Sequence, residues 1–134
     1  MKKALTLSII LTITSFWIAQ PAMAATSLSY YEFTWPDNYH HSYSNTKFSN
    51  TDGTVVVNGW QTNDRQGAQN VYSVVVYGSF SDDYLGNAAT VTGNYSQTGT
   101  WYSAVITNVP SGSGYQIRID NMVYGVNKGA GNAY

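Results

Sequence analysis

The chain has 134 residues, a formal net charge of −1 and no cysteine. The missing cysteines exclude disulfide scaffolds, thiol catalysis and cysteine-based zinc sites. Seven acidic and six basic side chains give no basic footprint, which argues against nucleic acid and anionic membrane surfaces as partners.

The first 24 residues are predicted to be a secretory signal peptide. Lys2 and Lys3 precede a mostly apolar stretch over 4–19, and the AMA motif at 22–24 places small residues at the −3 and −1 positions of a cleavage site. The apolar stretch is shorter than the roughly 20 residues that a spanning helix requires. We therefore expect cleavage after residue 24, which removes two lysines and changes the net charge from −1 to −3. The product is expected to be secreted and extracellular, without a membrane segment.

The composition after residue 24 favours strands over helices. This part contains two leucines and one glutamate, while tyrosine, valine and threonine, which suit a pleated and half-buried surface, dominate. No stretch has apolar residues at i, i+3, i+4 and i+7. We expect one β-domain over 25–126, followed by a flexible C-terminal tail over 127–134.

The first strand is expected at 28–35, in the segment LSYYEFTW. Alternation puts Tyr31, Phe33 and Trp35 on one face. Pro36 removes a backbone donor and is expected to end the strand.

The middle of the chain is expected to contain three further strands. A short strand at 46–50 precedes a longer one at 54–60, in which Asn58-Gly59 is either a tight turn or a bulge. The run 71–80 is the most apolar and is expected to be the central strand. Gly86 and Asn87 predict a turn over 81–87.

The C-terminal half contains the clearest hairpin signal, from 88–95 to 100–107. A loop at 109–114 then leads into the alternating strand 115–119. Tyr115 is expected to tie this loop to the strand, as a corner tyrosine does in immunoglobulin-like domains. Six to eight short strands with a turn about every 8–12 residues predict an all-β fold, an antiparallel β-sandwich of the immunoglobulin-like or jelly-roll-like kind.

The segment PDNYHHSYSN at 36–45 holds both histidines of the chain. Neighbouring residues in an extended segment point to opposite sides, and zinc sites take three or four protein ligands, so a metal site is the minor alternative. An exposed polar loop is the main expectation. A second alternative is a contact surface formed by Tyr39, His40, His41 and Tyr43.

Two acidic neighbours, Asp82 and Asp83, form a candidate calcium site with Asn87, since calcium takes oxygen ligands at irregular spacing. The alternative is a solvated turn. Glycoside hydrolysis needs two carboxyl groups facing each other across a bond, which sequence neighbours seldom do. The chain also lacks a GxSxG motif. We therefore expect no enzyme and no cofactor, and a small hydrolase using His40 or Asp82 stays as an alternative.

Aromatic residues are the most informative group. The part after residue 24 has twelve tyrosines, three tryptophans and three phenylalanines. Such rings suit sugar or protein recognition, and the alternative is that they fill cross-strand pairs of an ordinary β-domain. The candidate ligand-binding residues are Trp35, Tyr39, His40, His41 and Tyr43, followed by Trp60, Trp101 and Tyr102.

Two resemblances bear on function. The AMAA signal end, the aromatic strand YEFTWP and the polar segment NYHHSYSNTKFSNTDGTVVVN resemble small exported β-sandwich proteins of Gram-positive bacteria without an established activity. The segment YHHSYSNTKFSNTDGTVVVNG is similar to the central part of lactococcin-type bacteriocins, which are secreted β-sandwich peptides acting on cell-wall synthesis. The second resemblance implies an antimicrobial role.

These observations predict a secreted, non-enzymatic binding module that contacts cell-wall glycan or another extracellular protein. The alternatives are a secreted bacteriocin-like or toxin-like protein and a small secreted hydrolase. The sequence leaves the ligand and the oligomeric state open.

Overall fold

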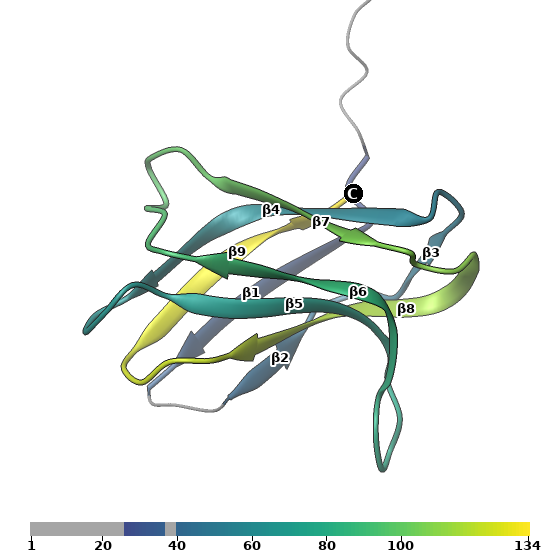
Figure 1. Cartoon of the computed structure of the whole chain (residues 1–134), viewed down its shortest axis with the longest axis horizontal. Helices are drawn as coiled ribbons and strands as arrows, with labels where there is room; N and C mark the ends of the chain where they lie inside the picture. Colours follow the sequence, from purple (N-terminus) through teal and green to yellow (C-terminus); the bar gives the residue numbers. More distant parts are fainter. Residues whose placement is uncertain (1–25, 37–39) are drawn as a thin grey trace, which may run out of the picture.

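The computed structural model describes residues 26–36 and 40–134 (Figure 1). Within these ranges the regular structure is all strand, and no helix is long and apolar enough to cross a bilayer. The expected signal peptide and Tyr39 lie outside the described residues. The strands are β1 (Ser29–Trp35), β2 (His41–Tyr43), β3 (Phe48–Asn50), β4 (Thr54–Asn63), β5 (Gln69–Val76), β6 (Asp83–Thr92), β7 (Tyr102–Thr107), β8 (Gly112–Asn121) and β9 (Asn127–Ala133).

The strands form one antiparallel sheet in the order β1-β9-β4-β7-β6-β5-β8-β2, with β3 also paired to β8. The sheet folds into two packed layers: layer 1 contains β1, β9, β4 and β7, and layer 2 contains β6, β5, β8, β2 and β3. The predicted all-β antiparallel fold is confirmed, although the described residues form nine strands where six to eight were expected. Two strands lie where none was expected: β2 in the segment expected to be a loop, and β9 in the segment expected to be a flexible tail.

The two layers nearly close into a barrel-like shape. On one side β6 and β7 meet at the pair Asn87 and Thr107. On the other side the amide of Asn45 donates to the carbonyl of Tyr30 at 2.8 Å, and the Ser29 hydroxyl donates to the carbonyl of Thr46 at 2.8 Å. These bonds tie β1 to the chain that follows β2, so the edges of the sheet face each other.

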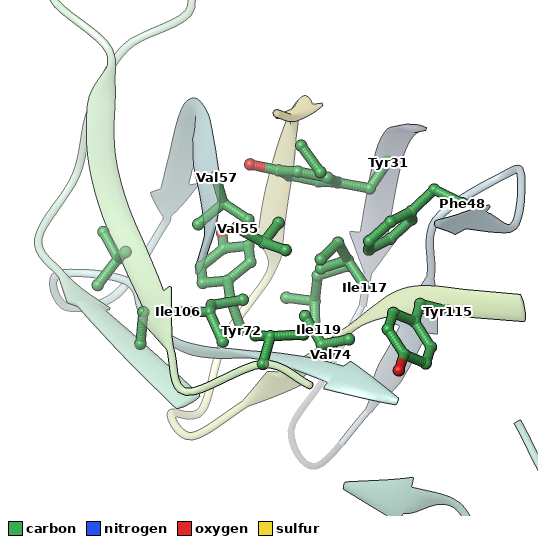
Figure 2. Packing of buried hydrophobic residues seen from close by; sticks show 14 of the residues in the cluster. Tyr31, Phe48, Val55, Val57, Tyr72, Val74, Ile106, Tyr115, Ile117 and Ile119 are labelled. Atoms are coloured by element: carbon green, nitrogen blue, oxygen red, sulfur yellow. The ribbon is translucent and has the colours of Figure 1, made fainter. Parts of the chain in front are cut away.

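Alternation places the core between the layers. On β1, Tyr31, Phe33 and Trp35 share one face, as the sequence predicted, and this face is buried while the residues between them are exposed. On β8, Ile117 and Ile119 face inward in the same way. Figure 2 shows the inward side chains of both layers meeting. The other labelled members of this core are Phe48, Val55, Val57, Tyr72, Val74, Ile106 and Tyr115.

A chain of hydroxyl groups runs through this core, and we call it the core tyrosine network. The Tyr31 and Tyr102 hydroxyls lie 2.7 Å apart, Tyr102 donates to Tyr72 at 2.7 Å, and Tyr72 donates to Gln61 Oε1 at 2.9 Å. Gln61 is fully buried. Its remaining bonds join Nε2 to the carbonyls of Val91 and Gly93, and Oε1 to Asn70 Nδ2.

The C-terminal residues, expected to be a flexible tail over 127–134, form β9 instead. This strand pairs with β1 along one edge and with β4 along the other. Its glycines face large side chains. A Cβ at Gly131 would collide with the Tyr31 hydroxyl, and one at Gly129 would collide with the Phe33 ring. These glycines make room for the aromatic side chains. Because glycine is uncommon inside strands, the composition of 127–134 did not indicate a strand.

The pair Asn58-Gly59 is neither a turn nor a bulge. It lies in the middle of β4, whose pairings with β7 and β9 have no register shift. A Cβ at Gly59 would lie 2.8 Å from each of the Tyr31 and Tyr102 hydroxyls. The glycine therefore leaves space for the core tyrosine network.

Two local predictions in the second half of the chain are wrong. The expected hairpin between 88–95 and 100–107 is reduced to the single pair Asn87 and Thr107, because the rest of β6 pairs with β5 while β7 pairs with β4 in the other layer. The expected turn at 81–87 belongs largely to β6, where Gly86, with a φ of 70°, lies at a register shift of the β5–β6 pair. A turn signal does not reveal whether the flanking strands pair or separate into two layers. In contrast, the corner tyrosine is confirmed, since the Tyr115 hydroxyl donates to the Pro110 carbonyl at 3.1 Å.

Candidate binding surface

The outer face of layer 2 gathers charged and aromatic side chains around Arg118. On β8 the inward positions Ile117, Ile119 and Asn121 alternate with the outward positions Arg118 and Asp120. The register of β5, β8 and β2 then sets two rows across three strands. The rows are Ser73–Arg118–Tyr43 and Val71–Asp120–His41.

The Arg118 guanidinium is held by two carboxylates. Nη1 lies 2.7 Å from Asp82 Oδ2, and Nη2 lies 2.8 Å from Asp120 Oδ1. Nε also donates to both oxygens of Asp120 at 3.0 Å. The rings of Tyr43 and Tyr84 lie 5.9 and 5.4 Å from the guanidinium carbon, within cation–π range. Hydrogen bonds to Asp120 and Asp82 raise the pKa of Arg118, against the effect of burial.

Asp82 enters this cluster from the loop between β5 and β6. Its side chain is 3% exposed. Tyr43 donates to Oδ2 at 2.6 Å, and the amide of Gly78 donates to Oδ1 at 3.3 Å. Burial alone would raise the pKa of Asp82, but the hydrogen bonds from Tyr43, Arg118 and Gly78 outweigh it and lower the pKa. Burial and the bond to Asp82 raise the pKa of Tyr43 to about 12.

Two recesses adjoin Arg118. The larger, of about 420 Å³, is lined by His40, His41, Val71, Ser73, Tyr84, Arg118, Asp120, Asn121 and Met122. The smaller, of about 300 Å³, is lined by His41, Tyr43, Arg118 and the loop from Tyr77 to Asp82. His41 and Arg118 line both recesses, so the two recesses lie side by side. We call this surface, with both recesses and the loop from Tyr77 to Asp82, the Arg118 face.

Exposed rings surround the Arg118 face. Tyr77 is 54% exposed, Tyr84 is 55% exposed, and Phe80 is fully exposed on the loop that projects from the body of the molecule (Figure 1). The Tyr43 ring contacts His41 and Tyr77 edge to face, at centroid distances of 5.5 and 5.3 Å. Exposed aromatic groups beside a hollow are typical of a recognition surface.

The candidate residues from the sequence divide among three places. Trp35 and Tyr102 lie in the core, where Trp35 stacks on Phe33 at 4.2 Å and Tyr102 belongs to the core tyrosine network. Alternation along β4 puts Trp60 on the outer face of layer 1, and Trp101, which is 40% exposed, lies directly before β7. His40, His41 and Tyr43 belong to the Arg118 face. The ligand-binding prediction therefore joins residues that do not form one surface.

The structure does not bring the three candidate calcium ligands together as a metal site. Asp82 is bound to Arg118 and Tyr43, while Asn87 lies at the bulge of β6 and donates to the Thr107 hydroxyl at 3.3 Å. In the described ranges, no three His, Asp or Glu side chains are grouped so that they could hold a metal ion. The two histidines both line the larger recess.

Sequence reasoning missed most of the Arg118 face. Arg118, Asp120, Tyr77, Phe80 and Tyr84 were not singled out as site residues. A partial signal existed, because Arg118 is an outward charge in an alternating apolar strand. Its partners come from β2, the loop from Tyr77 to Asp82, and β6, and one sequence does not reveal which strands become neighbours.

Comparisons of the chain with protein-family models, with curated proteins and with solved structures gave no match. The case for function therefore depends on the Arg118 face itself.

Proposed function

We propose that this chain is a secreted, non-enzymatic binding module that holds a cell-wall glycan on the Arg118 face. The observation that carries this proposal is the pair of adjoining recesses, of about 420 and 300 Å³, that share His41 and Arg118. Recesses of this size are at the lower end of the range for small-ligand sites, about 300–1,000 Å³. Two of them side by side suit consecutive sugar units of one glycan chain.

The side chains of the two recesses have the chemistry that sugars require. Tyr84 in the larger recess and Tyr77 in the smaller one are each half-exposed, and such rings stack on the apolar faces of pyranose units. Asp120 and the histidines offer hydrogen-bonding groups to sugar hydroxyls at the edges of those rings. Export by a signal peptide, as the sequence predicts, would deliver the domain to the cell wall.

The carboxylates favour binding over hydrolysis. A glycosidase needs one protonated and one ionised carboxyl group on opposite sides of the scissile bond, at least about 5 Å apart. Asp82 and Asp120 instead share the Arg118 guanidinium. The hydrogen bonds that lower the pKa of Asp82 keep it ionised and unsuited to donate a proton.

Binding of the folded protein to insoluble peptidoglycan and to a glycan array tests the proposal. We expect Tyr84→Ala to weaken binding about tenfold, because loss of one ring stack costs about 1–1.5 kcal/mol. Tyr84→Phe keeps the ring and should keep the affinity.

The matched control is Tyr30→Ala, which removes a 39% exposed tyrosine from the outer side of β1 in layer 1. This variant should bind as the wild type does. Circular dichroism and urea unfolding check that each variant is folded. Absence of glycan binding by the wild type, or equal losses in Tyr84→Ala and Tyr30→Ala, would contradict the proposal.

A further inference from the structure

The charge balance of the Arg118 face restricts which sugars it accepts. Two carboxylates, Asp82 and Asp120, and one guanidinium line the recesses, and no lysine does. These three groups together leave one negative charge, and the exposed Asp83 follows directly after Asp82. A surface of this sign attracts a cationic ligand and repels an anionic one.

Arg118 offers little to an acidic sugar. Each of its three nitrogen atoms already donates to a carboxylate, Nη1 to Asp82, and Nη2 and Nε to Asp120. A guanidinium has five N–H groups, so Nη2 keeps a second hydrogen, and Nη1 also lies 3.5 Å from the Tyr43 hydroxyl. A uronic acid or a phosphate that accepted one of these hydrogens would lie beside Asp82 and Asp120, whose negative charges repel it.

Asp120 is the carboxylate that remains accessible. Its side chain is 25% exposed and lines the larger recess. Oδ1 accepts hydrogen bonds from Nε and Nη2 of Arg118, while Oδ2 accepts from Nε. Because a carboxylate oxygen has two acceptor positions, Oδ2 retains one for a ligand.

Tyr84 lines the same recess and is 55% exposed. This ring and Asp120 already contact the Arg118 guanidinium, whose carbon lies 5.4 Å from the Tyr84 ring centroid. A carboxylate oxygen together with a tyrosine ring recognises an ammonium group in the same way, through a charge-assisted hydrogen bond and a cation–π contact. Val71 and Met122 supply apolar lining to this recess.

We propose that the larger recess binds a sugar unit carrying a free amine, whose ammonium donates to Asp120 Oδ2 beside the Tyr84 ring. The next unit of the same chain passes His41 and Arg118 and lies in the smaller recess against Tyr77. The preferred ligand is a polymer of amino sugars whose amines are not acetylated. This inference rests on the proposed glycan-binding function and narrows it to one class of sugar.

Calorimetric titration with three oligosaccharides of equal length tests this inference: glucosamine, N-acetylglucosamine and glucose oligomers, at a pH at which the amine is protonated. We expect the glucosamine oligomer to bind at least about tenfold more tightly than the other two, and its affinity to fall with added salt. Asp120→Asn should abolish this preference while keeping the affinity for the acetylated oligomer. Asp52→Asn, at an exposed acid after β3, should behave as the wild type does.

The outcomes separate the two proposals. Equal or tighter binding of the N-acetylglucosamine or glucose oligomer by the wild type would overturn the amine preference and leave the glycan-binding function standing. A preference that survives in folded Asp120→Asn would also overturn it. If no oligosaccharide and no peptidoglycan binds, both proposals fail. The wild-type comparison needs no variant, so the test does not depend on Asp120→Asn being folded.

Discussion

The protein contains two hydrogen-bonded tyrosine networks that differ in charge and burial. The core tyrosine network joins Tyr31, Tyr102 and Tyr72 to Gln61 between the layers, and all four side chains are buried. The network on the Arg118 face joins Tyr43 and Asp82 to Arg118 and lies on the outer side of layer 2.

The difference shows what each network does. The core network is neutral and buried away from solvent. A polar group that loses its partner there has no water to bond to instead. The outer network is charged, and its members keep partial contact with solvent, which weakens each ion pair. Because Asp120 keeps an accessible oxygen, the outer network has bonding capacity left for a ligand. We therefore expect changes in the core to affect folding most, and changes in the outer network to affect binding most.

Alkaline pH should have the largest effect, and it acts mainly on the core network. Burial raises the pKa of Tyr31, Tyr72 and Tyr102 above the ordinary 10.0. Above that value the unfolded chain releases protons that the folded chain retains, so stability is complete below pH 10 and falls as the pH rises. Each core group contributes about 1.4 kcal/mol per pH unit, so the three give about 4 kcal/mol per unit, and Tyr43, whose pKa is raised to about 12, adds a further contribution. Urea unfolding from about pH 9 to 11 measures this slope.

Tyr102→Phe should reduce the alkaline slope by about 1.4 kcal/mol per pH unit, because one of the three core groups is removed. Tyr77→Phe, at an exposed tyrosine of the loop after β5, is the matched control and should keep the wild-type slope. A Tyr102→Phe slope equal to that of the wild type would show that the buried hydroxyl groups do not control alkaline unfolding.

The next largest effect is expected for Gln61→Leu, which removes the amide at the end of the core network. The change removes the hydrogen-bond partner of four groups: the carbonyls of Val91 and Gly93, the side-chain amide of Asn70 and the hydroxyl of Tyr72. Buried polar groups without partners cost about 1–3 kcal/mol each, and since such costs are not additive we expect a total loss of roughly 3–4 kcal/mol. Urea unfolding at neutral pH measures it. Gln66→Leu, at an exposed glutamine of the loop before β5, should change stability by less than about 0.5 kcal/mol.

The smallest of the three effects on stability is expected for Arg118→Met. Asp82 then keeps hydrogen bonds from Tyr43 and Gly78 but loses its ion pair. Because Arg118 itself is 19% exposed, we expect a loss of about 1–2 kcal/mol in the same unfolding assay. Arg65→Met, at an exposed arginine, is the control. A loss as large as that of Gln61→Leu would mean that the outer network supports the fold as strongly as the core does.

The sequence predicted the features that depend on side chains alternating between the two faces of a strand. The alternation along 28–35 and 115–119, the corner tyrosine at Tyr115 and the all-β antiparallel class agree with the structure. These features depend on residues close together in the chain, and a two-residue period is visible without knowing the partner strand.

The sequence did not predict the features that depend on which strands become neighbours in the sheet. β6 and β7 look like a hairpin locally, yet they share a single residue pair and each pairs mainly with another strand. The Arg118 face joins β2, β5, β6 and β8, and its rows exist because of a register that no single segment encodes. Trp35 and Tyr102 were chosen as exposed rings because composition does not distinguish a buried aromatic side chain from an exposed one.

The position of β9 decides when this protein can fold. The last strand lies between β1 and β4, so layer 1 cannot assemble until Asn127–Ala133 are available. When the chain is synthesised from its N-terminus, the edges of β1 and β4 that β9 covers therefore stay unpaired until almost all the other residues have been made. Most contacts join distant parts of the sequence, which slows folding further. Until residues 127–133 are present, layer 1 therefore stays incomplete and the chain cannot reach its folded state.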